Sequence, residues 1–126
     1  MTEGASRIRR LDSRRLQEMC AHDGQGRIGV DRVFTAEDFE GPWNFVDYAV
    51  LPAGCSIGNH EHGRDEELYF VIEGRGRMQL DDESFEVGPG SLVLNRSRGR
   101  HGLENTGSEP LRILVVEVGI PTGDGS

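Results

Sequence analysis

Short apolar segments separated by turn-forming residues run through most of this sequence, and they constrain its fold more than any other feature. From residue 27 onward, Gly, Pro, Asn and Asp fall between these segments. This spacing is typical of an all-β sandwich or barrel, and no long helical periodicity competes with it. We predict strands at residues 28–34, 44–51, 56–62, 67–73, 77–80, 84–87, 91–94, 101–105 and 112–118.

The residues between the segments predict how the strands connect. Residues 74–76 and 81–83 are expected to form hairpin turns, and Gly and Pro at 87–90 a sharp turn. A tight turn over 63–65 would fold the segment that begins at Glu67 back beside the segment before it. Together, these connections indicate a double-sheet jelly roll.

With 126 residues, the chain is long enough for one domain with its own apolar core. We divide it into an N-terminal arm, a barrel domain and a disordered tail, at residues 1–23, 24–120 and 121–126. Within the arm, residues 7–20 are expected to form a short helix or an irregular segment, with Asp12 or Ser13 as its N-cap.

The net charge and the N-terminal residues of the sequence restrict the expected binding partners and the expected cellular compartment. A formal net charge of −8 argues against nucleic-acid binding, which needs a positive surface. Neither a signal-peptide core nor an apolar run of membrane-spanning length is present, so we expect no membrane partner and a cytoplasmic location. In that reducing compartment Cys20 and Cys55 are expected to be free thiols.

Two apolar runs, 68–72 and 113–116, are continuous rather than alternating, so both faces of their strands must be covered. If Glu67 points into the barrel, every second residue after it does too. The outward set would then be Leu68, Phe70 and Ile72. The N-terminal segment or a second subunit could cover this set. We favour a homodimer, because so short a chain has little material left for a second layer.

Three of the four histidines are spaced so that they can close one metal site with a carboxylate. His60 and His62 stand two apart in a predicted strand and so share one face. Glu67 begins the next apolar run, and His101 follows later in the chain. We predict that these residues bind one divalent ion. The fourth histidine, His22, lies in a Gly-rich stretch without ligand spacing and is expected on a surface loop.

The ligand set narrows the identity of the metal. Nitrogen and oxygen ligands without thiolate suit Mn²⁺, Fe²⁺, Co²⁺, Ni²⁺ or Zn²⁺. Mn²⁺ or Fe²⁺ is favoured, because the thiolate-rich set of structural zinc is missing. Four protein ligands leave two adjacent octahedral positions open. Such a site invites a bidentate acid that the metal can polarise.

Several polar residues are candidates for substrate binding or acid–base catalysis beside such a metal. Arginines in the loop before His101 are placed to neutralise a substrate carboxylate; they are Arg96, Arg98 and Arg100. The candidates for a general acid or base are Tyr69, Ser56 and Asp47, the last a polar residue within an apolar strand.

The pattern around the histidines resembles the first cupin motif, which is glycine, five residues, His-x-His, three or four residues, glutamate, six residues and glycine. Every slot is matched here, by Gly54, His60, His62, Glu67 and Gly74. The resemblance implies that Glu67, and not the preceding glutamate, is the carboxylate ligand.

The second cupin motif is matched in part. His101 and Asn105 keep its His-x3-Asn ending, and Gly88-Pro-Gly90 resembles its opening turn. Its Pro-x-Gly before the histidine is replaced by the arginine-containing stretch 95–100. From about residue 24 to 118, the chain resembles small single-domain cupins. The resemblance implies a double-stranded β-helix barrel and a likeness to oxalate-binding manganese cupins, and to oxalate-decarboxylase-like and mannose-6-phosphate-isomerase-like proteins.

The resemblance leaves three functions open. The first is a metal-dependent enzyme that acts on a small carboxylate or a hydroxy or keto acid, as a lyase, isomerase or dioxygenase. The second is a module that binds a small carboxylate without turning it over. The third, a structural or storage cupin with a vestigial site, is disfavoured because all four ligand residues are present.

Overall fold

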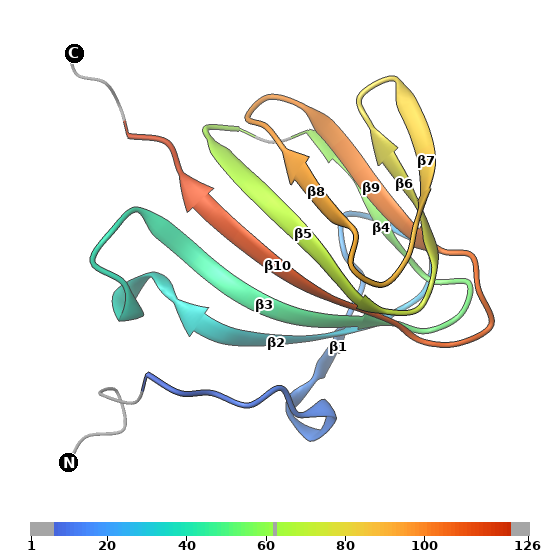
Figure 1. The fold of residues 1–126 in the computed structure, drawn as a ribbon, viewed down its shortest axis with the longest axis horizontal. Coiled ribbons are helices and arrows are strands. Elements are labelled where there is room, and N and C mark those ends of the chain that lie inside the picture. Colours follow the sequence, from blue (N-terminus) through green and yellow to red (C-terminus); the bar gives the residue numbers. More distant parts are fainter. Residues whose placement is uncertain (1–6, 62, 122–126) are drawn as a thin grey trace.

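The computed structural model describes residues 7–61 and 63–121, which form two β-sheets that face each other (Figure 1). The larger sheet contains, in spatial order, β1 (Gln17–Met19), β2 (Ile28–Thr35), β3 (Trp43–Leu51), β10 (Leu111–Gly119), β5 (Asp65–Glu73) and β8 (Leu92–Asn95). The smaller sheet contains β4 (Ser56–Glu61), β9 (Arg100–Asn105), β6 (Gly76–Leu80) and β7 (Glu83–Val87). The pairings within both sheets are antiparallel, and the predicted all-β jelly roll is confirmed.

Two connections differ from the sequence-based expectation. The hairpin expected at 74–76 is wrong, because β5 and β6 belong to different sheets. Gly74 turns this corner with a φ of +96°, and a Cβ there would lie 2.5 Å from the carbonyl oxygen of Pro110. Segment 67–73 likewise does not fold back beside β4, since β4 pairs with β9 in the smaller sheet. The hairpin over 81–83 is confirmed, because β6 pairs with β7.

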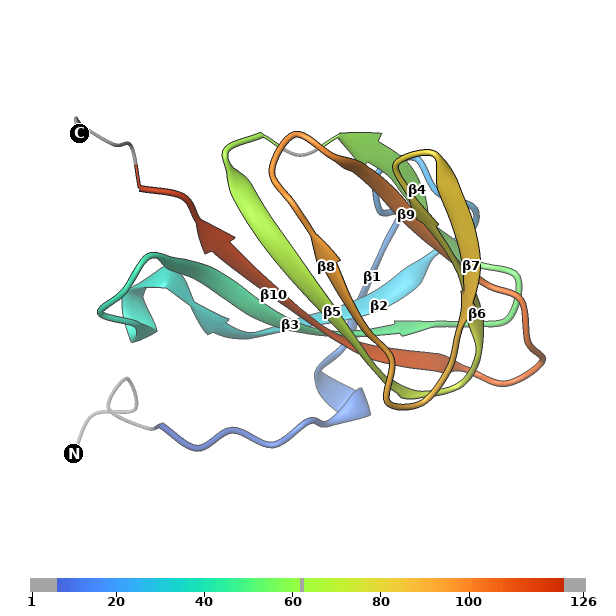
Figure 2. The same cartoon turned by 45° about the horizontal axis from the view of Figure 1, so that its top comes forward.

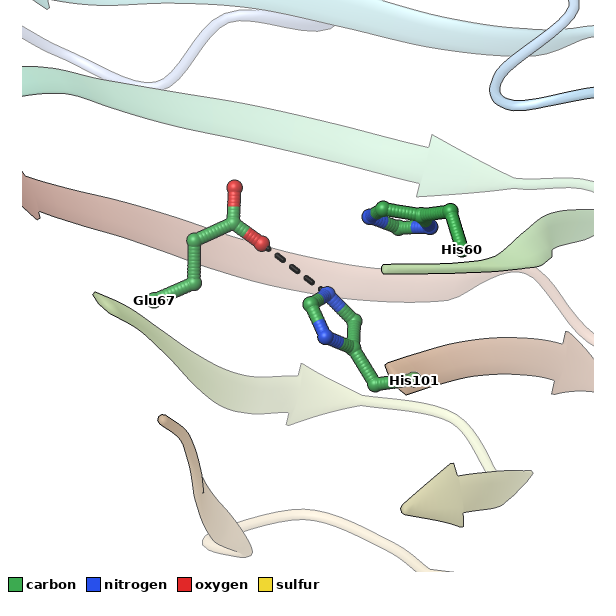
Figure 3. Close-up of side chains that lie close together, drawn as sticks. All are labelled: His60, Glu67 and His101. Atoms are coloured by element: carbon green, nitrogen blue, oxygen red, sulfur yellow. Dashed lines mark hydrogen bonds and ion pairs between the residues drawn. The ribbon is translucent and has the colours of Figure 1, made fainter. Parts of the chain in front are cut away.

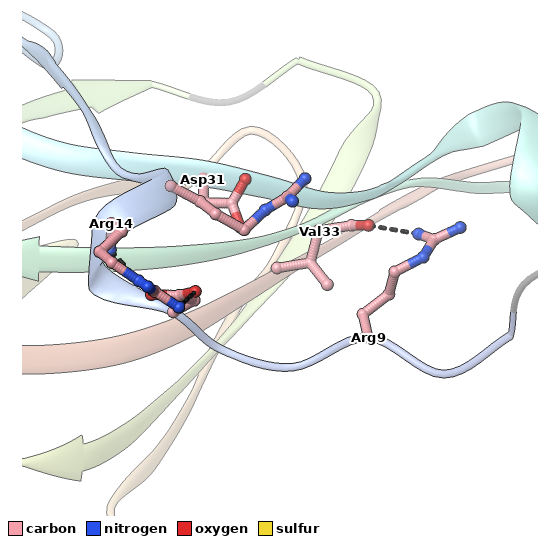
Figure 4. Close-up of polar contacts among 6 residues, drawn as sticks. Arg9, Arg14, Asp31 and Val33 are labelled. Atoms are coloured by element: carbon pink, nitrogen blue, oxygen red, sulfur yellow. Dashed lines mark hydrogen bonds and ion pairs between the residues drawn. The ribbon is translucent and has the colours of Figure 1, made fainter. Parts of the chain in front are cut away.

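The N-terminal segment runs beside β2, away from the smaller sheet (Figures 1 and 2). It contains a 3-10 turn, Ser13–Arg15, whose N-cap Asp12 accepts a hydrogen bond from the Arg14 backbone N–H at 2.9 Å. Arg9 Nη1 donates to the carbonyl of Val33 at 2.6 Å (Figure 4). Part of the expected arm therefore joins the sheet through β1. Residues 1–6 of the arm and 122–126 of the tail lie outside the described residues.

The apolar core fills the space between the sheets. Its most buried members, with none of their surface exposed, are Leu51, Met78, Leu111 and Ile113. Along β5 the expected alternation is present: Glu67 is buried and the next residue, Leu68, is 37% exposed. The inner face of β5 therefore carries Glu67 toward the interior of the barrel.

The outer face of the larger sheet is apolar where β8, β5 and β10 lie side by side. Lateral pairing brings together a group that we call the outer patch: Leu68, Phe70, Leu92, Leu94, Leu114 and Val116. Leu92 and Leu94 are 64% and 49% exposed. No helix among the described residues has the length and apolar character needed to cross a membrane.

Candidate metal centre

His60 and His101 face each other directly on the paired strands β4 and β9. Their rings meet edge to face with centroids 4.4 Å apart, and His101 has no exposed surface. Nδ1 of His60 lies 2.7 Å from the carbonyl oxygen of Gly58, so this nitrogen carries the proton and donates it. His60 is thereby fixed in the tautomer whose Nε2 has a lone pair for a metal.

Glu67 reaches this pair from the opposite sheet (Figure 3). Its Oε1 lies 3.1 Å from Nε2 of His101, and one ligand atom from each of His60, Glu67 and His101 lies within 4.8 Å of the others. An ion bonded to nitrogen and oxygen at about 2.1 Å holds neighbouring ligand atoms about 3 Å apart and opposite ones about 4 Å apart. The three residues therefore form a group that could hold a metal ion.

The fourth expected ligand, His62, lies outside the described residues. Its place in the ligand set stays a prediction. The three described residues come from three strands and two sheets, so the centre exists only once the barrel is closed.

A second carboxyl group, Glu117, lies beside Glu67 and was missed by the sequence reasoning. The two residues are paired across β10 and β5. Asn44 Nδ2 donates to Oε2 of Glu117 at 2.8 Å. Burial and then a hydrogen bond with Glu67 raise the pKa of Glu117 to about 7, against the opposing effect of Asn44. The signal was present, since Glu117 interrupts an apolar run two residues after the inward-facing Val115.

Tyr69 stands next to the cluster on the inner face of β5. Its ring meets the ring of His101 edge to face, with centroids 5.3 Å apart. Burial, followed by the charges of Glu67 and Glu117, raises the pKa of Tyr69 well above its ordinary value. Its hydroxyl therefore stays protonated at neutral pH and can serve as a hydrogen-bond donor.

A cavity of about 160 Å³ opens beside Glu67 and Tyr69. Asp47 also lines it, and both of its oxygens accept hydrogen bonds from Arg32, at 2.9 and 3.0 Å. The third acid–base candidate, Ser56, lies elsewhere: its hydroxyl accepts from the backbone N–H of Gln25 at 2.7 Å and borders a different hollow.

The arginine loop lies next to His101. A second cavity, of about 140 Å³, is lined by Arg96 and Arg100 together with His101 and Asn95. All three loop arginines are exposed, and Arg100 lies 3.9 Å from the carboxylate of Glu61. Asn95 is 1% exposed, and neither its amide nitrogen nor its amide oxygen finds a hydrogen-bond partner among the described residues.

His22, expected on a surface loop outside the site, is exposed but stacks on His60. Their ring centroids are 3.5 Å apart and the rings are within 10° of parallel. The Gly58 N–H donates to the Ala21 carbonyl at 3.0 Å, and a side chain at Gly58 would collide with the backbone of His22. Spacing along the chain could not reveal this contact, because it depends on how the loop packs against β4.

A small two-sheet barrel with two imidazoles and a carboxylate gathered inside defines a class of β-barrel proteins with an internal candidate metal centre. The family model described as the Cupin domain matches residues 47–117, more than half of the chain. The chain therefore belongs to the cupin domain family, and the resemblance inferred from its motifs is confirmed.

Individual relatives agree with this assignment. An oxalate-binding protein of Thermotoga maritima is 26% identical over 93 residues, which cover 74% of this chain and 77% of the relative. An uncharacterized protein of Methanocaldococcus jannaschii is 42% identical over 66 residues, 52% of this chain and about half (53%) of that protein. The crystal structure of a predicted oxalate decarboxylase from Thermotoga maritima aligns with a TM-score of 0.81 and 23% identity, covering 83% of this chain and 92% of the other.

Proposed function

We propose that this protein is a metal-dependent cupin that binds a small carboxylate, or a hydroxy or keto acid, at one divalent ion. The ligands would be His60, His62, Glu67 and His101. The observation that carries the proposal is the convergence of His60, Glu67 and His101, whose ligand atoms lie within 4.8 Å of one another inside the barrel. The oxalate-binding relative supports an acid as the ligand.

Mn²⁺ or Fe²⁺ is the proposed ion, with Zn²⁺, Ni²⁺ and Co²⁺ as alternatives, because the donors are nitrogen and oxygen without thiolate. A bound ion would polarise a chelated carbonyl and stabilise the charge that develops beside it. Tyr69 keeps its proton and lies against His101, so it can donate a hydrogen bond to an acid at the centre. Arg96 and Arg100, with His101 in the second cavity, would offset the charge of a short acid, and Arg98 belongs to the same proposed set.

We favour an enzyme: a lyase, an isomerase or a dioxygenase. The half-buried Glu117, whose pKa is raised to about 7, places a proton next to Glu67 that could move during a reaction. A module that binds acids without turning them over is the second candidate. It is supported by the engagement of both Asp47 oxygens with Arg32 and by the position of Ser56 outside the cavity.

Metal analysis of protein purified without added metal is the first test. Oxalate and related acids are then titrated into metal-loaded protein, metal-free protein and a metal-exposed Glu67→Gln variant. We expect binding only to the loaded wild type, where an acid at 100 times its Kd should stabilise the fold by about 2.7 kcal/mol. Equal affinity of the loaded and metal-free forms would contradict chelation. NMR analysis of the products then separates turnover from binding alone.

The proposal includes a homodimer formed through the outward face of Leu68, Phe70 and Ile72 together with the rest of the outer patch, and small molecules rather than nucleic acids as ligands. The net charge of −8 supports the second part, since a phosphate backbone would be repelled. A cytoplasmic location stays a prediction.

A further inference from the structure

The cavity beside Glu67 has a cation on the side away from the metal centre. Arg32, on β2, lines this cavity together with Glu67 and Tyr69, on β5. Arg32 pairs laterally with Asp47, Asp47 with Val115, and Val115 with Tyr69, so the four residues form one row across the inner face of the larger sheet. Three strand spacings, about 14 Å, separate the backbone of Arg32 from that of Tyr69.

The guanidinium of Arg32 is held in one orientation. Its Nε and Nη2 donate to the two oxygens of Asp47 at 2.9 and 3.0 Å, and its Cζ lies over the ring of Phe45, 4.0 Å from the centroid. Asp47 is itself only 7% exposed. A bidentate ion pair combined with a contact to an aromatic ring holds a guanidinium in place, so that it is pre-organised to bind a second planar anion.

Arg32 also keeps donors for a ligand. Among its contacts with the described residues, Nε and Nη2 form hydrogen bonds and Nη1 forms none. The side chain is 53% exposed and lines the cavity, which makes Nη1 the candidate donor to an anion that enters it. Arg96 and Arg100, in contrast, line the second cavity, beside His101.

The distance across the cavity sets the length of the ligand. Because the guanidinium folds onto β3, it stands about two strand spacings, roughly 10 Å, from the β5 residues next to the metal centre. For an ion held by the Glu67 carboxylate above β5, a metal–oxygen bond of about 2 Å and a hydrogen bond of about 3 Å would leave roughly 5 Å between the two ends of the ligand. The directly bonded carboxylates of oxalate are too close together for this span. A cavity of about 160 Å³ is comparable to one that accepts benzene, roughly 150 Å³, so the ligand is small.

We propose that Arg32 recognises the distal carboxylate of the ligand, and that the ligand is a four- to six-carbon 2-hydroxy or 2-oxo dicarboxylate. Its hydroxy-acid or oxo-acid end would chelate the metal, and its far carboxylate would bind Nη1 of Arg32. This inference rests on the proposed function of the metal centre and adds to it the length and the charge of the acid.

Isothermal titration of the Mn²⁺-loaded protein with matched acids tests the proposal. Malate is compared with 2-hydroxybutyrate, and 2-hydroxyglutarate with 2-hydroxypentanoate, because each pair differs by a distal carboxylate in place of a methyl group. Arg32→Gln should weaken binding of malate and 2-hydroxyglutarate by about 10- to 100-fold. It should leave oxalate and the two methyl-ended acids within about twofold of wild type.

Two variants serve as controls. Arg14 makes the same bidentate contact with Asp12 outside the cavity, so Arg14→Gln should leave the affinities for all of these acids unchanged. Arg32→Lys keeps a cation beside Asp47 but loses the planar fork, and so should fold even if Arg32→Gln does not. It should still lose much of the preference for malate over 2-hydroxybutyrate.

The outcomes separate this inference from the function on which it rests. Failure of the loaded wild type to bind any acid would overturn the proposed function. Binding of oxalate with no preference for the distal carboxylate, or an equal loss for malate and 2-hydroxybutyrate in the Arg32 variants, would overturn the role of Arg32 alone. A loss of the malate preference only in the Arg96→Ala/Arg98→Ala/Arg100→Ala variant would assign the distal carboxylate to the loop instead.

Discussion

Glu67 and His101 belong to opposite sheets of the barrel, and Nε2 of His101 lies 3.1 Å from Oε1 of Glu67. Glu67 is 7% exposed and His101 has no exposed surface, so the contact is shielded from water. A buried carboxylate is costly unless a cation or hydrogen-bond donors accompany it. The imidazole of His101 and the proton on Glu117 partly offset the cost of burying the Glu67 carboxylate. A bound divalent ion would offset more of this cost.

The first prediction concerns metal binding. His101→Ala, or His60→Ala combined with His62→Ala, should lower metal content to a small fraction of one ion per chain. The strands should persist, because the core around Leu51 and Met78 does not involve these residues. Elemental analysis measures the metal and circular dichroism the fold. His22→Ala is the matched control, since His22 stacks on His60 but is not one of the three grouped residues. Full metal content in the double variant would contradict the ligand assignment.

The second prediction is that Asn105 stabilises the fold but does not contribute to metal binding. Asn105 Nδ2 donates to the carbonyls of Leu51 and Glu109, both at 2.8 Å, and its Oδ1 accepts from the Gly107 N–H at 2.9 Å. Asn105→Ala should cost about 2–4 kcal/mol of unfolding free energy, because buried backbone groups lose their partners. Urea unfolding measures this loss, and the metal affinity of the folded variant should be unchanged.

Asn95 provides the comparison for that experiment. Both asparagines are 1% exposed, but neither side-chain amide atom of Asn95 is hydrogen-bonded within the described part of the chain. Asn95→Ala should therefore cost much less stability than Asn105→Ala. Similar losses in the two variants would show that side-chain volume, and not hydrogen bonding, decides the cost.

The third prediction concerns the pH dependence of stability in the metal-free protein. Folding raises the pKa of Glu117 from its ordinary 4.5 to about 7, so the folded state binds this proton more tightly than the unfolded chain does. The resulting stabilisation is complete below the unfolded pKa and is lost as the pH rises through the folded pKa. Because the group is only half-buried, we expect a loss of about 1 kcal/mol across this window.

Glu117→Gln should flatten that part of the stability profile, measured by urea unfolding at several pH values. Glu83→Gln is the control, because Glu83 is exposed and lies on the outlying hairpin formed by β6 and β7. A profile that keeps the same slope in Glu117→Gln would assign the pH dependence to other groups.

The fourth prediction is the homodimer. Light scattering should give about twice the chain mass of 13.9 kDa. Leu92→Glu combined with Leu94→Glu should shift the protein toward the monomer, because it places charge in the outer patch. Leu11→Glu is the control: Leu11 is 45% exposed and lies outside that patch. A wild-type protein that is monomeric at micromolar concentration would contradict the dimer.

Local pattern was sufficient for much of the fold. The spacing of apolar segments predicted every strand from β2 to β10 to within a few residues, because a strand needs only local alternation and bounding turn residues. It missed β1, which has three residues, all exposed, and depends on pairing with β2. It also treated 74–76 as a hairpin, because a glycine-rich corner between sheets has the same composition as a turn within one.

The sequence by itself determined the family, the strand set and the residue types of the candidate centre. The reason is that these depend on the spacing of nearby residues such as His60 and Glu67, which can be read directly along the chain. Only the tertiary structure decided that Glu67 meets His101 across the barrel, that Glu117 lies against Glu67, and that Arg32 lines a cavity together with Glu67. These contacts join strands far apart in the chain. Strand order and sheet closure bring them together, and neither is encoded in the spacing of nearby residues.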